Sequence, residues 1–402
     1  MNPIYRGILP PKNKTVFWMK GKKLLVYTPT GWKETSADIT IDDSMVEGSE
    51  NPVESKVIQQ SLNAKQQALS LAINQKQNTL TIDTALSETS ENPIENNAVY
   101  NQYMTNDDTA DILEILGIYD YIATPLTLKA ITSGNIIVKC ESGYEVSMSY
   151  KKNNDDWVSF TSSTSGTSIA VTVGDKVQFK GSNSYRGHNT FSVSNGCTFN
   201  AFGNAYSLIN PSGFATQTSL ARSYALSYLF QNCTGLIEAK NLKLPATTLT
   251  GAEGCYSNMF AGCSNLTKGP ELPQMTDLAR NCYEYMFDGC SSLIKGPSVL
   301  SANVVGYQAY QYMFRNCSSL TKAPDILATL MSYSGCPYMF YGCTNLKSIK
   351  HMVSSYSNSN SQFTSWTYGV SATGTFTKNS ACTNWATGTS GIPSGWTIVD
   401  AS

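Results

Sequence analysis

Hydrophobic and polar positions change their spacing several times along the chain, and each spacing predicts a different kind of structure. Near the N-terminus, the short apolar runs Val16–Met19 and Leu24–Tyr27 flank a Lys-Gly-Lys-Lys sequence, which is typical of a β-hairpin. Between residues 123 and 205, six short runs rich in β-branched and aromatic residues are separated by turn residues. This pattern predicts an all-β sandwich.

Residues 41–122 contain an internal duplication that predicts helices. The sequence Ser-Glu-Asn-Pro-Val-Glu at 49–54 recurs as Ser-Glu-Asn-Pro-Ile-Glu at 90–95, and both proline and glutamate suit a first helical turn. Because a helix this polar is marginal in water, we expect it to pack in an oligomeric stem; a single helix lying on a local core is the alternative. The apolar residues expected to form the stem follow an eleven-residue repeat: Ile58, Leu62, Leu69, Ile73 and Leu80.

The last 200 residues carry the most regular pattern in the chain. Five segments share the sequence Phe-x-Gly/Asn-Cys-Ser/Thr-x-Leu, and their cysteines lie 30, 27, 27 and 26 residues apart. Repeats of this length predict a solenoid, in which each unit packs only against its neighbours. Since Gly and Asn tolerate a left-handed backbone, we expect a short helix to end before each cysteine. The aligned cysteines are Cys233, Cys263, Cys290, Cys317 and Cys343.

Together these patterns predict a multidomain α+β protein with four parts. A β-rich anchor is expected at residues 1–40 and an oligomeric helical stem at 41–122. A β-sandwich is expected at 123–205, followed by a leucine-rich-repeat-like solenoid at 206–402. Repeat arrays need an atypical end that covers the last open face. The apolar residues expected to supply that cap are Trp385, Ile392, Trp396 and Ile398.

Composition argues against several classes of function. Charged residues make up 14% of the chain, against about 25% in ordinary globular proteins, and the net charge of −1 does not suit a nucleic-acid binder. No apolar run approaches the ~18 residues of a membrane span, so we expect no membrane insertion. With two histidines and no Cys-x-x-Cys pair, we predict no metal, no cofactor and no catalytic residues. The eleven cysteines are expected to be free, buried thiols.

Charge is also distributed unevenly. Residues 1–33 contain seven basic residues and no acidic one, whereas residues 34–122 contain sixteen acids and three bases. Such a step marks a segment boundary. The basic head is either an ordinary solvated surface or a plug that docks into an acidic socket on a larger particle. The residues expected to anchor it are Arg6, Trp18, Lys20, Lys22, Lys23 and Trp32.

Two motifs resemble known families. The duplicated Ser-Glu-Asn-Pro block resembles the stem segments of bacteriophage fibre and tail proteins, which are commonly trimers. The cysteine repeats resemble the BspA-like leucine-rich repeats of surface and phage proteins associated with Bacteroides-type gut bacteria. The chain is therefore similar to a head or tail fibre of a Bacteroides-infecting, crAss-like phage. The resemblance implies a structural virion protein, assembled in the host cytoplasm, whose N-terminus binds a capsid or tail component.

The same resemblance places a host-attachment surface, for a glycan or a protein, on the distal repeats. Tyrosine suits such a surface because it offers a large contact area and a hydrogen-bonding tip. We expect four tyrosines to be possible receptor contacts, with burial in the core as the alternative: Tyr307, Tyr310, Tyr333 and Tyr341. Two other functions stay open. One is a bacterial cell-surface adhesin, against which the lack of an export signal counts, and the other is a decorative head fibre without receptor binding.

Overall fold

The computed structural model describes residues 119–401, except 143, 183–188, 250–251 and 356–360, together with the backbone of four strands near the N-terminus. The chain divides into two units, Met1–Tyr119 and Asp120–Ser402. Apart from the two short 3₁₀ helices η1 (Ala205–Leu208) and η2 (Phe214–Thr216), all regular elements of the described residues are β-strands.

The expected α+β class is therefore wrong, because the part of the chain that the structure describes is nearly all β and shows no α-helical stem. The segment 41–118, on which that expectation was based, lies outside the described residues. So do the five residues that were expected to form the stem: Ile58, Leu62, Leu69, Ile73 and Leu80.

The described strands of the first unit form one small sheet with the order β1-β2-β3-β4. Strands β2 and β3 are antiparallel, with Lys20 opposite Lys23, so the hairpin predicted from the two apolar runs is confirmed. A second antiparallel connection joins β3 to β4. The strands are β1 (Tyr5–Arg6), β2 (Phe17–Lys20), β3 (Lys23–Thr28) and β4 (Gly31–Glu34).

The second unit begins with two facing sheets. One has the order β13-β12-β5-β10-β7-β8 and the other β11-β6-β9, and apolar side chains such as Leu128, Val138 and Phe179 are buried between them. All six strands expected from the short β-branched and aromatic runs are present, and β11 and β12 were missed. The strands are β5 (Leu126–Thr132), β6 (Gly134–Cys140), β7 (Val146–Lys152), β8 (Val158–Ser162), β9 (Thr167–Val171), β10 (Lys176–Gly181), β11 (Asn189–Ser194) and β12 (Thr198–Asn204).

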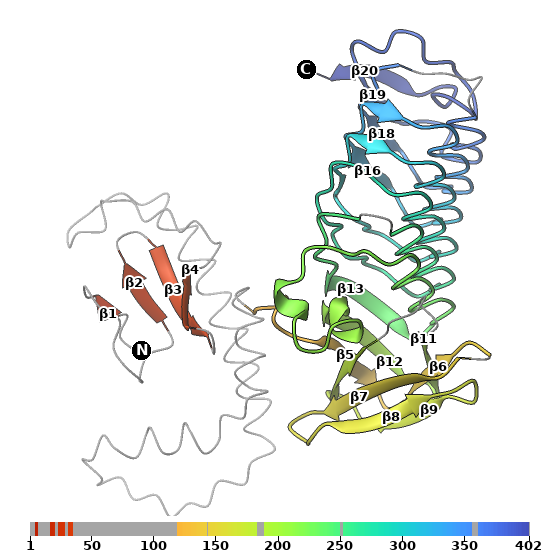
Figure 1. Ribbon diagram of the computed structural model, residues 1–402. Coiled ribbons are helices and arrows are strands. Elements are labelled where there is room, and N and C mark those ends of the chain that lie inside the picture. Colours follow the sequence, from red (N-terminus) through yellow and green to blue (C-terminus); the bar gives the residue numbers. More distant parts are fainter. Residues whose placement is uncertain are drawn as a thin grey trace, which may run out of the picture. The chain divides into compact units, whose positions relative to one another are not determined.

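The sandwich continues directly into the solenoid. Strand β12 pairs in parallel with β13 (Leu236–Lys243), which belongs to the first coil. In the shared core, the ring of Phe191 stacks on that of Phe230 at 5.5 Å between centroids. Residues 123–205 and 206–402 therefore form one continuous body, with the coils stacked from β13 towards β20 (Figure 1).

One side of the coil stack consists of short parallel strands. Each strand pairs in parallel with its equivalent in the next coil, so the C-terminal part is a β-solenoid. The strands form a sheet ordered β14-β16-β18-β19-β20 and a smaller pair, β15 and β17. They are β14 (Val299–Leu300), β15 (Val304–Val305), β16 (Lys322–Ile326), β17 (Leu330–Met331), β18 (Ser348–His351), β19 (Thr375–Asn379) and β20 (Thr397–Ala401).

The repeated sequence motif forms a ribbon of consecutive turns on another side of each coil. Within a ribbon, backbone N–H groups alternate between two acceptors. Met286 N–H donates to the carbonyl of Tyr283 three residues back, whereas Phe287 N–H donates to the carbonyl of Met313 in the next coil. In every ribbon, the first, fifth and ninth residues have positive φ. The six ribbons are 224–233, 254–263, 281–290, 308–317, 334–343 and 361–370.

This backbone corrects the expectation of a short helix before each repeat cysteine. An α-helix needs negative φ throughout and a bond from each N–H to the carbonyl four residues back. The ribbons break both conditions at regular intervals. The reasoning about the left-handed position before the cysteine was sound, because Gly289 and Asn316 both have positive φ.

The left-handed backbone at Gly289 predicts different effects on stability for two substitutions of this residue. Its φ is +72°, and an added Cβ would meet Gly262 at an ordinary 3.7 Å, so a substitution changes backbone strain rather than packing. Asparagine already occupies the equivalent position at Asn316. We expect Gly289→Asn, whose amide must turn away from Asn316 in the next coil, to cost less than about 1 kcal/mol, whereas Gly289→Val should cost about 2 kcal/mol. Urea unfolding measures both, and equal effects would contradict the assigned backbone.

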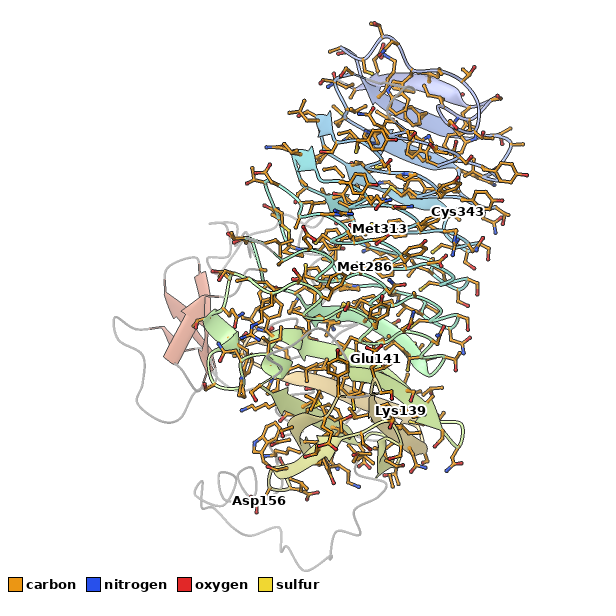
Figure 2. All side chains as sticks on the ribbon, turned by 45° about the vertical axis from the view of Figure 1, so that its right-hand side comes forward. Lys139, Glu141, Asp156, Met286, Met313 and Cys343 are labelled. Carbon is orange, nitrogen blue, oxygen red and sulfur yellow. The ribbon has the colours of Figure 1, made fainter. Side chains whose placement is uncertain are left out.

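The inward side chains of the ribbons stack in ladders along the solenoid. The second, third, sixth, seventh and tenth residues of the 281–290 and 308–317 ribbons are buried, and Met286 and Met313 lie on successive coils (Figure 2). The ring of Phe287 stacks on Phe260 and Phe314, at 5.3 Å in each case. The expectation of free, buried cysteines is confirmed for all eleven. Of the four cap residues, Trp385, Ile392 and Trp396 pack against this core, whereas Ile398 is exposed.

Candidate binding face on the solenoid

The outward side chains of the ribbons also form columns. The fifth residue of three successive ribbons is a tyrosine, and each is partly exposed. Tyr312 stacks on Tyr285 at 4.5 Å and on Tyr338 at 4.8 Å, with the rings close to parallel. Positive φ is uncommon for so bulky a residue, and it recurs here at all three positions. The hydrogen bonds between coils and the stacking of the rings stabilise this backbone conformation.

The eighth residue of each ribbon forms a second column beside the first. Tyr341 and Tyr368 occupy it in the last two ribbons and stack at 4.8 Å, and Tyr341 also meets Tyr338 at 6.1 Å. Half of the Tyr368 surface is exposed. Five tyrosines thus follow one another along four coils, and we call them the tyrosine row: Tyr285, Tyr312, Tyr338, Tyr341 and Tyr368.

An arginine–aspartate pair lies in the same eighth-residue column. The Arg315 guanidinium lies over the rings of Tyr312 and Tyr285, at 4.6 and 5.4 Å from their centroids. It also donates two hydrogen bonds to the Asp288 carboxylate, from Nε at 2.8 Å and from Nη2 at 2.7 Å. The hydrogen bond with Asp288 is the main cause that raises the pKa of Arg315. Because the two charges neutralise each other, this pair adds little net charge to the face.

The geometry of the row limits what it can recognise. In the middle of the row, each ring face is covered by the neighbouring ring, so a ligand reaches ring edges and hydroxyl groups rather than free faces. Partial burial, followed by the neighbouring Tyr312, raises the pKa of Tyr285 to about 12. Its hydroxyl is therefore neutral at physiological pH and serves as both a hydrogen-bond donor and an acceptor.

A second aromatic stack lies at the residue just before the ribbons. Tyr307 and Tyr333 stack at 6.1 Å, and the Arg280 guanidinium lies 4.9 Å from the Tyr307 ring centroid. Tyr333 is one of the most exposed large side chains of the described residues, at 54%.

Of the four tyrosines expected to contact a receptor, three lie on the surface and one is buried. Tyr307, Tyr333 and Tyr341 lie on the surface as expected. Tyr310 is buried, because it is the third residue of its ribbon and stacks on Tyr283 inside the core. Sequence reasoning missed most of the row. The available signal was the tyrosine directly before the Met-Phe pair in three of the five repeats: Tyr285, Tyr312 and Tyr338.

The expected anchor residues lie in the first unit, where the backbone of the strands is described. Five of them lie on strands of the small sheet, and Lys22 lies outside the described residues. Trp18 is opposite Leu25, and Trp32 is opposite Tyr27. The five on strands are Arg6, Trp18, Lys20, Lys23 and Trp32.

The sandwich carries a separate shallow hollow of about 370 Å³ on strands β7, β8 and β10. Its lining includes hydroxyl side chains such as Ser149 and Ser159, whose oxygens lie 3.2 Å apart. The Lys180 ammonium borders it and lies 4.8 Å from the Trp157 ring centroid. The lining also includes Met148, Phe160 and Pro211, so the hollow combines hydroxyl and apolar groups with one cation.

Comparison with known proteins gives no functional assignment. No protein family, curated protein or solved structure matches the chain. Within the described ranges, no group of three or more His, Cys, Asp or Glu side chains is arranged to hold a metal ion. Among those residues there is also no helix long and apolar enough to cross a bilayer.

Proposed function

We propose that the chain is a structural fibre protein of a virus particle and that its solenoid attaches the particle to the host surface through the tyrosine row. The observation that carries this proposal is the stacked, partly exposed row on four successive coils. Aromatic residues are enriched in protein interfaces, and a stack holds them rigid before contact, which lowers the entropy cost of binding.

The chemistry of the face favours a neutral ligand rich in hydrogen-bonding groups. The stacked tyrosine rings recur at about the spacing of neighbouring strands, with centroids 4.5–4.8 Å apart, and the nearby Arg315 charge is paired with Asp288. A surface glycan or a polar protein segment that runs along the coil axis fits this arrangement. Each contact is weak, and presentation of several copies on one particle would multiply the affinity.

Residues 1–40 of the first unit are the proposed attachment point to the particle. Support comes from the separation of this unit and from the seven basic residues with no acid in residues 1–33. The partner is a capsid or tail component with an acidic surface.

We also propose a homo-oligomer, a trimer by the resemblance to phage fibres, and a passive binding role rather than catalysis. Sedimentation of the full chain would test the oligomeric state.

Removal of hydroxyls from the row is expected to weaken host binding without unfolding the protein. In the double variant Tyr312→Phe/Tyr338→Phe the rings still stack, but two polar contacts are lost. At about 0.5–1.5 kcal/mol each, we expect an affinity loss of roughly 10-fold. The melting temperature should stay within about 2 °C of the wild type, since the packing is unchanged. Titration of the labelled full chain onto host cells measures the affinity.

The matched control is Tyr144→Phe/Tyr150→Phe, which removes two hydroxyls from the sandwich. We expect it to bind host cells as the wild type does. If the wild type binds and the row variant binds equally well, or if both variants lose the same affinity, the tyrosine row is not the contact surface.

A further inference from the structure

Two buried cysteines on neighbouring coils lie unusually close together. The Sγ atoms of Cys255 and Cys282 are 3.3 Å apart, and neither residue is exposed to solvent. Each is the second residue of its ribbon, so the pair bridges the ribbons 254–263 and 281–290. The same position is Ala225 in the preceding ribbon and Ala309 in the following one. The pairing is therefore confined to these two coils.

The repeat cysteines at the tenth ribbon position are engaged differently. The thiols of four of the five donate to the backbone carbonyl of a phenylalanine in the preceding coil, as Cys290 does to Phe260 at 3.1 Å. Cys263, Cys317 and Cys343 make the same contact at 2.9–3.1 Å. These sulfurs are directed towards the backbone of the neighbouring coil, whereas those of Cys255 and Cys282 are directed towards each other.

The backbone spacing suits a covalent bond between the pair. Neighbouring strands lie about 4.7–4.9 Å apart, which falls within the Cα separation of about 4.4–6.8 Å found across disulfides. A disulfide needs the sulfurs at about 2.05 Å, so they must approach by little more than 1 Å. Rotation of the two side chains, together with a small local shift of the two ribbons, provides that movement, because Cβ atoms across a disulfide lie about 3.5–4.5 Å apart.

We propose that Cys255 and Cys282 form a disulfide under oxidising conditions and thereby cross-link the ribbons 254–263 and 281–290. With a small-molecule disulfide such as oxidised glutathione as the oxidant, one protein thiolate attacks it and releases one small thiol. The second protein thiolate then attacks the mixed disulfide and releases the other. Two protein thiols are oxidised to one disulfide, and one small disulfide is reduced to two thiols.

Burial makes this oxidation slow and its product durable. Burial raises the pKa of the Cys282 thiol well above its ordinary value, so the reactive thiolate is scarce in the folded state. Oxidation therefore requires local opening of the coil, and the closed coil then shields the new bond from reductants. A chain made with free thiols in a reducing compartment would form this disulfide after it leaves that compartment.

The test exposes the reduced full chain to oxidised glutathione, at a urea concentration just below the unfolding transition so that coils open locally. After alkylation of the remaining thiols, peptide mass spectrometry should find a linked pair of peptides that contain Cys255 and Cys282. Closure of this 27-residue loop should raise the melting temperature by on the order of 5 °C, and dithiothreitol should reverse the increase.

Two variants give the proposal a control. Cys282→Ala should abolish both the linked peptide and the thermal shift, whereas Cys290→Ala should retain the 255–282 link. The proposal is overturned if the wild type yields no such link under these conditions, or if links among the tenth-position cysteines form in equal yield.

Discussion

Replacement of Phe314 by alanine is expected to lower the free energy of unfolding of the second unit by about 3–5 kcal/mol. The ring is fully buried and stacks on Phe287 at 5.3 Å and on Phe340 at 5.7 Å, so its removal leaves a cavity in the middle of the ladder. At about 2–4 °C per kcal/mol, the melting temperature should fall by roughly 10 °C. Thermal unfolding followed by circular dichroism measures the change.

The matched control for Phe314 is Ile294→Ala. Ile294 is an apolar side chain of the same solenoid that is 59% exposed, and we expect its loss to change stability by less than about 0.5 kcal/mol. A cost below about 1 kcal/mol for Phe314→Ala, or equal costs for the two variants, would show that the phenylalanines do not form a packed ladder.

Acidification from pH 7 to pH 4 is expected to destabilise the C-terminal coils through His351. This histidine is fully buried beside the rings of Phe363, Trp366 and Trp385, and its Nδ1 accepts the N–H of Val353 at 3.1 Å. Burial lowers its pKa to about 3. Between pH 3 and about 6.5 the unfolded chain therefore binds more protons, so stability falls as the pH falls, by about 1.4 kcal/mol per unit. The expected loss at pH 4 is on the order of 3 kcal/mol.

A His351→Asn variant separates this contribution from that of the carboxylates. Asparagine retains an acceptor near the position of Nδ1 but does not titrate. We expect the variant to be less stable at pH 7 and to lose less stability between pH 6.5 and pH 4.5 than the wild type. Parallel pH profiles of urea unfolding for the two proteins would exclude His351 as the titrating group.

Much of the β-structure could be predicted because its signals are local. The apolar runs around the Lys-Gly-Lys-Lys sequence predicted the β2–β3 hairpin, and six short runs separated by turn residues predicted β5 to β10. The regular spacing of the repeat cysteines predicted stacked units. In each case neighbouring residues alone carry the pattern, so no knowledge of distant contacts was needed.

The ribbons could not be predicted, because their stability depends on contacts between coils. The N–H of Phe287 bonds to a carbonyl 26 residues away, at Met313, and no local propensity encodes this bond. Met and Ala suit a helix when read alone. The sixth ribbon was missed as a repeat because Thr367 and Val370 replace the usual phenylalanine and cysteine.

The binding face, too, could be predicted from the sequence only in part. The repeated tyrosine before Met-Phe was visible in the sequence, but whether a given tyrosine points outward depends on its place in the ten-residue ribbon. Tyr310 and Tyr312 are two residues apart, yet the first is buried and the second is partly exposed. An alternating period would place residues two apart on the same face, whereas the ribbon buries the first and leaves the second partly exposed.

The central functional claim is that the tyrosine row contacts the host surface, and hydroxyl-radical footprinting of the full chain, free and bound to host cells, tests it most directly. The account predicts reduced oxidation of Tyr285, Tyr312, Tyr338, Tyr341 and Tyr368 in the bound state, with no change at Trp157 on the sandwich. Protection that is confined to the sandwich, or oxidation of the row that is identical in the two states, would contradict the claim.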